Sequence, residues 1–286
     1  MDTGRPRAAR PSLRGGDVRR VSGFAVRWIV FAVAVVLWQL ATQAADDPFF
    51  PTPWQILRRC NELWLTTTTG GFGLADTVFD DILPSIGRVL LGWALAAVIG
   101  IVIGTALGRS RTGMDYVGPL FAFFRALPSP ALLPVFLILF GIESGMKLAL
   151  ILFAAVWPIL MNTVDGVRSV DAVKTDTAKS FRTPRTQWVM MVVLPAALPK
   201  IFAGLRLSLA ISVILMVVSE MVGVTSGIGY QLRNAQSQFE FTTMWAWIVL
   251  LGIIGYGLNL ALLAVERRAL RWQPTRAAVQ TAKVGG

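Results

Sequence analysis

The residue types that most often carry chemistry are scarce in this chain of 286 residues. It holds no His and a single Cys, Cys60. Zinc sites and Ser-His-Asp triads require His or several thiolates, so the sequence excludes both, together with an intrachain disulfide. A Gly-rich phosphate loop ending in Lys-Ser or Lys-Thr is also absent from the sequence. We therefore expect no catalytic residue, no metal site and no cofactor, and any ATP to be bound by another chain.

The remaining acids and bases stand in an apolar chain. Hydrophobic residues make up 55% of it and charged residues 15%, against about 25% charged in soluble domains. Several windows reach the roughly 20 apolar residues that cross a bilayer, and the alternating pattern of a membrane barrel is not seen. The sequence predicts an all-α polytopic membrane protein with about six transmembrane helices, at about 28–45, 86–108, 116–140, 148–163, 201–222 and 244–265.

Basic residues are distributed unevenly around these spans. The formal net charge is +11. Most Lys and Arg fall before the first span, after the second and fourth spans, and in the C-terminal tail, while the intervening segments carry more Asp and Glu. Because Lys and Arg collect on the cytoplasmic side, this pattern predicts that both termini are cytoplasmic. It also explains the basic balance without a nucleic-acid partner.

A basic polar segment, DTAKSFRTPRTQWVMMVVLPAALP at 176–199, follows the fourth span. Thr175 can cap a helix that begins at Asp176, whose carboxylate suits the positive end of the helix dipole. The helix is expected to stop at Thr183, because a following proline disfavours α geometry.

A second helix is expected to start after Pro184 and to run from Arg185 to Val193. Leu194-Pro195 is expected to break it, and Pro199 to delay the next span. The segment is therefore predicted to form a helix–turn–helix bracket on the inner face.

This segment resembles the EAA loop of ABC importer permeases, which reads Glu-Ala-Ala, three residues, Gly, nine residues, Ile, one residue, Leu-Pro. The matching positions hold Asp176, Thr177, Ala178, Arg182, Val192, Leu194 and Pro195. Arg182 departs from the glycine of the pattern. A non-glycine residue in a left-handed turn costs about 1–2 kcal/mol, so either Pro184 builds the turn differently or the docking geometry has shifted.

Five further segments resemble the nitrate/sulfonate/taurine permeases of that class. In order they are FPTPWQIL (50–57), FFRALPSPALLPVFLILFGI (123–142), PILMNTVDGVRSVD (158–171), SGIGYQLRNA (226–235) and ERRALRWQP (266–274). The resemblance implies a type I importer permease with a MetI-like transmembrane domain. It implies a basic disordered cytoplasmic tail at 1–22, a permease domain at 23–272 with a coupling loop at about 164–200, and a cytoplasmic tail at 273–286.

The same resemblance implies partners and a substrate class. The chain would pair in the lipid bilayer of the inner membrane with a second permease chain, expected to be identical. Two copies of an ATP-binding cassette ATPase would power it, and an extracytoplasmic binding protein would deliver a small anionic or polar organic solute such as a sulfonate, taurine or nitrate. The first helix of the insert would be the coupling helix.

The expected ATPase-coupling residues are Asp176, Thr177, Ala178, Phe181, Arg182, Leu194 and Pro195. Phe181 is a large apolar side chain on a polar helix. It could be the anchor that enters an ATPase cleft, or it could pack under its own loop. The neighbouring cations could pair with ATPase acids, or could be ordinary positive-inside charge.

The expected pathway and gate residues are Arg125, Pro128, Pro130, Asn162, Ser219 and Glu220. Prolines break a helix, and a broken helix at membrane depth is tolerated where it lines a cavity or is buried in protein. Arg125 could steady an anionic substrate or reach lipid phosphate. Glu220, a carboxylate inside a span, could act at a gate or pair with a neighbour.

Two glycine patterns complete the expectations. Gly92, Gly100, Gly104 and Gly108 form a small-residue stripe suited to close helix packing, within the chain or at a dimer seam. Residues 223–230 are either a short re-entrant piece or a Gly-rich turn. The alternative functions are a secondary transporter, for which the second broken helix is missing, and an intramembrane enzyme, for which the reactive residues are missing.

Overall fold

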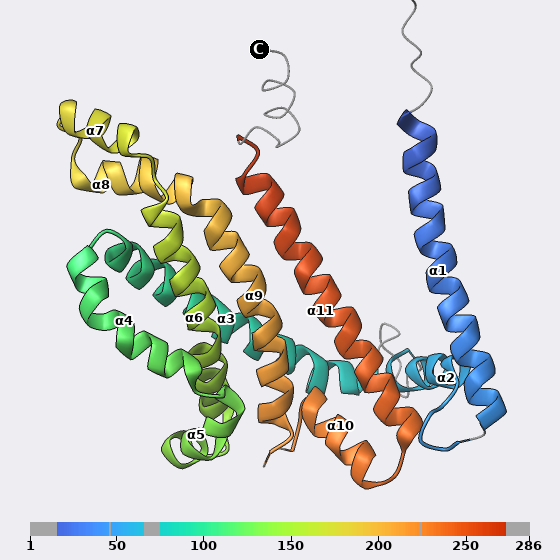
Figure 1. Cartoon of the computed structure of the whole chain (residues 1–286). Helices are drawn as coiled ribbons and strands as arrows, with labels where there is room; N and C mark the ends of the chain where they lie inside the picture. Colours follow the sequence, from blue (N-terminus) through green and yellow to red (C-terminus); the bar gives the residue numbers. More distant parts are fainter. Residues whose placement is uncertain (1–15, 46, 66–74, 223–224, 273–286) are drawn as a thin grey trace, which may run out of the picture.

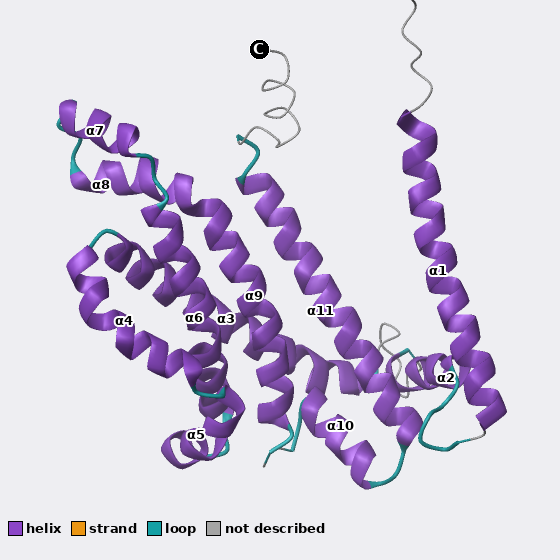
Figure 2. Ribbon diagram, viewed as in Figure 1, coloured by secondary structure: helices purple, strands orange, loops and turns teal. Residues whose placement is uncertain are grey.

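The structure, a computed structural model, describes residues 16–45, 47–65, 75–222 and 225–272. Throughout these ranges it contains helices and no strand (Figure 2). The long helices are α1 (Gly16–Ala45), α3 (Leu83–Gly108), α4 (Arg111–Ala126), α6 (Ser144–Arg168), α9 (Leu194–Glu220) and α11 (Phe241–Ala269). The shorter ones are α2 (Pro53–Trp64), α5 (Leu133–Phe140), α7 (Ala172–Ser180), α8 (Arg185–Trp188) and α10 (Ile228–Ser237). Two π turns, η1 (Val78–Ile82) and η3 (Val189–Val193), and a 3-10 turn, η2 (Ser129–Leu132), join some of them.

Helix α6 is the centre of the bundle, and both α3 and α9 pack against it (Figure 1). Its Leu150, Ile159 and Leu160 are buried. Helix α1 differs, because none of the span from Trp28 to Ala45 is buried. The chain therefore has a packed core of three helices and a peripheral first helix.

The number of spans agrees with the sequence. Among the described residues, five helices are long and apolar enough to cross a membrane, and a bent pair provides a sixth if it is counted as one span. Helix α1 begins at Gly16, inside the expected disordered tail. Hydropathy marks only the apolar part of a helix, and Arg continues a helix readily. The rest of that tail and the tail at 273–286 lie outside the described residues.

The proline-rich third span is bent by 84° between α4 and α5. Leu127, which precedes Pro128, has an extended backbone with ψ 126°, as the ring of a following proline favours. Helix α4 ends at Ala126, and η2 and α5 restart the chain in a new direction. The break expected from the prolines is confirmed, and it lies at Pro128.

The glycine stripe of α3 faces α6. A Cβ added at Gly92 would lie 2.8 Å from Ile151, and one at Gly100 would lie 2.9 Å from Ile159. Gly104 and Gly108 are equally close to Thr163 and Val167 of the same helix. The stripe therefore packs within the chain, and the alternative of a dimer seam is wrong for these four glycines.

Substituting Gly104 by Ala should destabilise the protein by about 1–3 kcal/mol, the usual cost of overpacking a core. The new Cβ would lie 2.7 Å from Thr163 Cβ and 2.8 Å from the Leu160 carbonyl oxygen, which is backbone and cannot rotate away. Gly257→Ala in α11 is the matched control, because nothing lies within 4 Å of its Cβ position. Thermal unfolding in detergent should show a lower midpoint for Gly104→Ala only; equal midpoints would contradict the packing.

Candidate functional sites: a projecting insert and a buried polar cluster

The insert α7–α8 projects from one end of the bundle, the end where α1 begins and α11 finishes (Figure 1). Phe181, directly after α7, is 80% exposed. Asp176 and Lys179 form an exposed ion pair with 3.2 Å between Oδ1 and Nζ. The insert therefore presents one large apolar side chain among charged ones.

Helix α7 begins and ends earlier than expected. Asp171 is its N-cap and accepts a hydrogen bond from the Val173 amide at 3.0 Å, and the helix ends at Ser180. The expected cap at Thr175 and stop at Thr183 are wrong. Asp171 satisfies a free amide one turn earlier, and the Thr175 hydroxyl donates to the Asp171 carbonyl instead.

Arg182 has φ +50°, so it adopts the left-handed conformation that the glycine of the EAA pattern would provide. The Thr183 amide donates to the Ala178 carbonyl at 3.0 Å, which closes the end of α7 around it. Pro184 therefore does not replace the left-handed turn. The chain keeps the turn and accepts a strained residue in it.

Arg182→Gly should stabilise the insert by about 0.5–1 kcal/mol. Relief of about 1–2 kcal/mol of left-handed strain is partly offset by the greater freedom of glycine in the unfolded chain. Hydrogen exchange of the α7 amides should slow. Arg185→Gly is the control, because Arg185 is the first residue of α8 and glycine there should speed local opening. Faster exchange in Arg182→Gly would show that the turn is not strained.

The helical structure is not interrupted at Leu194-Pro195. α8 passes into the π turn η3, and α9 starts at Leu194, so a single apolar span runs from Arg185 to Glu220. Proline lacks an amide proton, and the wider π turn leaves room for it in the first turn of α9. The expected break here, and the delayed start after Pro199, are wrong. Leu194 and Pro195 instead join the insert to a core helix.

The second grouping lies at the end of the bundle opposite the insert, where α3 and α10 begin and α9 ends (Figure 1). We call Asp81, Ser85, Arg88, Glu220 and Gln231 the polar cluster. Glu220 is fully buried and accepts hydrogen bonds from Arg88 Nη1 at 2.5 Å and Ser85 Oγ at 2.8 Å. Asp81 is 4% exposed and accepts one from Gln231 Nε2 at 2.7 Å.

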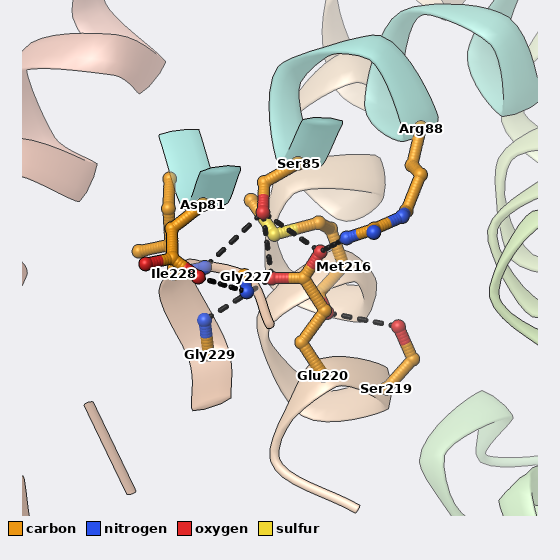
Figure 3. Close-up of polar contacts among 9 residues, drawn as sticks. All are labelled: Asp81, Ser85, Arg88, Met216, Ser219, Glu220, Gly227, Ile228 and Gly229. Carbon is orange, nitrogen blue, oxygen red and sulfur yellow. Dashed lines mark hydrogen bonds and ion pairs between the residues drawn. The ribbon is translucent and has the colours of Figure 1, made fainter. Parts of the chain in front are cut away.

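The cluster also holds the start of α10. The first amides of a helix lack partners inside it and attract negative charge. Here the Gly227 amide donates to Asp81 at 2.6 Å, the Ile228 amide to Ser85 Oγ at 3.1 Å and the Gly229 amide to Glu220 at 3.1 Å. Carboxylates from η1 and α9 and a hydroxyl from α3 thus fix α10 in place (Figure 3).

Glycines allow this approach. Gly227 has φ +120°, and a Cβ there would lie 2.6 Å from the Glu220 carboxyl carbon. A Cβ at Gly229 would lie 2.5 Å from the Val217 carbonyl oxygen. The expected element at 223–230 is a bend at 225–227 followed by α10, and Gly223 lies outside the described residues. Glycine at positions 227 and 229 therefore allows the start of α10 to lie in close contact with the buried Glu220.

Lys147 adds a fourth charge to this region. It is 2% exposed in the first turn of α6 and interacts electrostatically with Arg88 and Glu220. The sequence placed it in an outer segment between spans. The two acids, Asp81 and Glu220, and the two bases, Arg88 and Lys147, therefore cancel in charge at this end of the bundle. Buried charges are stable only when they are compensated in this way.

Sequence reasoning found Glu220 and missed its partners. Arg88 and Ser85 lie more than 130 residues away along the chain, at the start of an apolar helix. The available signal was that a carboxylate inside a span needs a cation, and Arg88 is a charged residue inside another span. Nothing in the sequence selects which cation approaches it.

The other pathway candidates occupy separate places. Arg125, Pro128 and Pro130 are exposed at the α4–η2 bend. Asn162 donates to the Pro158 carbonyl at 2.8 Å, and Ser219 is buried and donates to the Met216 carbonyl at 2.8 Å. Both polar groups are thus satisfied by their own helices. Of the six candidates, Arg125, Pro128 and Pro130 share the bend, Ser219 and Glu220 are consecutive in α9, and Glu220 is the one that belongs to the polar cluster.

Comparison with known proteins bears on the whole chain. The model of the family described as "Binding-protein-dependent transport system inner membrane component" matches residues 96–271, more than half of the chain. The taurine transport system permease protein TauC of Escherichia coli (strain K12) is 34% identical over 239 residues, covering 83% of this chain and 85% of TauC. The bicarbonate transport system permease protein CmpB of Synechococcus elongatus is 31% identical, covering 83% and 86% respectively.

Among solved structures, a chain of the MetNI methionine ABC transporter in an inward-facing conformation is similar with a TM-score of 0.59. The match covers 66% of this chain and 94% of that chain at 20% identity, which bears on the fold alone. The MetI-like fold expected from the sequence is confirmed. The family match and the sequence relatives agree with it: this chain belongs to the binding-protein-dependent transport system inner membrane components, the pore-forming and non-enzymatic permease subunits of ABC importers.

Proposed function

We propose that this permease imports a small anionic or polar organic solute, and that each of two permease chains docks one of two copies of a separate ATPase on its α7–α8 insert. The second permease chain is an identical copy, and an extracytoplasmic binding protein delivers the solute at the end that carries the polar cluster. Both termini lie on the ATPase side. Asp176, Thr177, Ala178, Phe181 and Arg182 form the docking surface, which Leu194 and Pro195 connect to α9.

One observation carries the coupling role: Phe181 is 80% exposed on an insert that projects from the bundle. An aromatic side chain left in water at the end of a basic helix is typical of a protein interface. The π turn supports the same role. Because η3 continues directly into α9, a force on the insert acts on a helix that packs against α6.

Orientation follows from charge. Lys174, Lys179, Arg182 and Arg185 lie on the insert, and Arg267 and Arg268 end α11 on the same side of the bundle. Basic residues favour the cytoplasmic side. The insert therefore faces the compartment that holds ATP.

The substrate class rests on the relatives and on one feature of the chain, an exposed cation beside the bend. TauC is named for taurine and CmpB for bicarbonate, both of which carry a compact anionic group. Arg125 is an exposed cation beside the bend at Pro128 and Pro130. We place the pathway wall at this bend and at Asn162, and the gate at Ser219 and Glu220, where the polar cluster holds α10.

Purification in mild detergent from native membranes, followed by mass spectrometry, tests the proposal. A co-purifying chain with a phosphate-binding Gly-rich loop supports the importer, and reconstitution with it should give ATP-dependent uptake of labelled taurine or of a small anion such as bicarbonate. A protein that transports without an ATPase would instead be a secondary transporter, the alternative left open by the sequence.

A further inference from the structure

The insert carries a groove as well as a projecting side chain. The groove lies between α7 and the segment α8–η3 and has a volume of about 360 Å³. Val173, Ala178, Phe181, Trp188 and Val192 supply most of its lining. Ligand pockets range from about 300 to 1,000 Å³, so this groove is at the small end of that range.

The groove occupies one face of α7. Val173, Thr177, Ala178 and Phe181 recur at the three- and four-residue spacing of a helix face, while Lys179 lies on the other face and Ser180 does not line the groove. Phe181 and Val173 are 80% and 70% exposed, so the apolar walls open to the surroundings. Ala178 is half-buried, and its small side chain keeps the groove open.

The charge around the groove restricts its occupant. Across residues 169–193 there are four cations and two acids. Lys174 lines the groove, and Arg182 and Arg185 are exposed nearby in the sequence. Lys179 is paired with Asp176, and the Asp171 carboxylate accepts from a helix amide, so the charged side chain that lines the groove, Lys174, has neither acid as its ion-pair partner. An apolar group flanked by acidic residues matches this surface.

We propose that this groove is a socket for one apolar side chain of the ATPase subunit, flanked by acidic residues of that subunit. The inference rests on the proposed function and extends it. The two subunits then contact each other in both directions. Phe181 projects towards the ATPase, and a side chain of the ATPase fills the groove of which Phe181 forms one wall. The small residue at position 178 is required because a larger one would occupy the socket.

The test is the affinity of the purified permease for its co-purified ATPase, comparing Ala178→Leu with Ser180→Leu. Both substitutions enlarge a side chain on α7, and leucine favours helix. Only Ala178→Leu fills the groove, so it should weaken ATPase binding at least tenfold, while Ser180→Leu should stay within twofold of the wild type. A monodisperse gel-filtration profile verifies that each variant is folded.

If Ala178→Leu fails to fold, two charge-reversal variants test the same proposal. Lys174→Glu on the groove side should weaken binding about tenfold and reduce its salt dependence, whereas Lys179→Glu on the other face should not. A wild type that binds an ATPase, together with variants that bind equally well, would overturn the socket and leave the proposed function standing. A wild type that binds no ATPase would overturn both.

Discussion

Glu220→Gln should lower the free energy of unfolding by about 3–5 kcal/mol, the usual cost of removing one partner from a buried ion pair. Glu220 is fully buried, and Arg88 is 13% exposed, so the arginine could not recover its lost partner from water. Lys147 would lose the same negative charge. The Gly229 amide and Ser85 would keep an oxygen acceptor but lose the charge that strengthens their bonds.

Glu266→Gln is the matched control. Glu266 pairs with Arg206 between α9 and α11, but the Arg206 side chain is 46% exposed. A partly exposed pair contributes less than a fully buried one, about 0–1 kcal/mol, so this variant should remain closer to the wild type than Glu220→Gln does. The measurement is thermal or denaturant unfolding of the purified protein in detergent.

A second variant tests whether the destabilisation comes from the unpaired charge of Arg88 or from the changed side chain at position 220. Arg88→Met together with Glu220→Gln removes the unpaired cation and should recover part of the lost stability. If Glu220→Gln unfolds like the wild type and only the transport rate falls, the cluster does not hold α10, and Glu220 acts at the gate by charge alone.

Phe181→Ala should leave the permease folded and weaken its binding of the ATPase by about 30-fold, since anchors of this kind contribute about 2 kcal/mol or more. The side chain is 80% exposed, so its removal takes little from the core. ATP-dependent uptake into reconstituted vesicles should fall with the affinity. The measurements are ATPase binding, uptake, and the unfolding midpoint of the permease alone.

Phe239→Ala is the control at the opposite end of the bundle. Phe239 is 75% exposed and follows α10, so the same truncation is made far from the insert. ATPase binding should be unchanged in this variant. If Phe181→Ala supports uptake as fast as the wild type does, Phe181 does not anchor the ATPase and only packs against its own loop.

The sequence by itself determined the class of fold, the family and the position of the insert. Apolar windows, the prolines of the third span and the distribution of Lys and Arg are local properties, and each acts within a few turns of helix. The break at Pro128 was predictable because a proline constrains the residue before it. The left-handed turn at Arg182 was not expected from the sequence, because the residue type argued against it, and the structure shows that the chain keeps this turn.

Helix ends within the insert were less predictable, because competing local signals decide them. Both Asp171 and Thr175 can cap a helix, and the chain uses Asp171. Leu194-Pro195 resembles a break, yet a π turn absorbs the proline. Differences between such alternatives are small, so sequence preferences alone do not select among them.

Only the tertiary structure decided what the buried charges and glycines do. Glu220 meets Arg88 across 132 positions of the chain, and the glycines of α3 meet α6 instead of another copy of the protein. Such pairings depend on which helices become neighbours. Helix periodicity gives the face that a residue occupies but not the helix that covers it. A buried charge demands a partner, and the packing of α3 and α9 at the start of α10 supplies one.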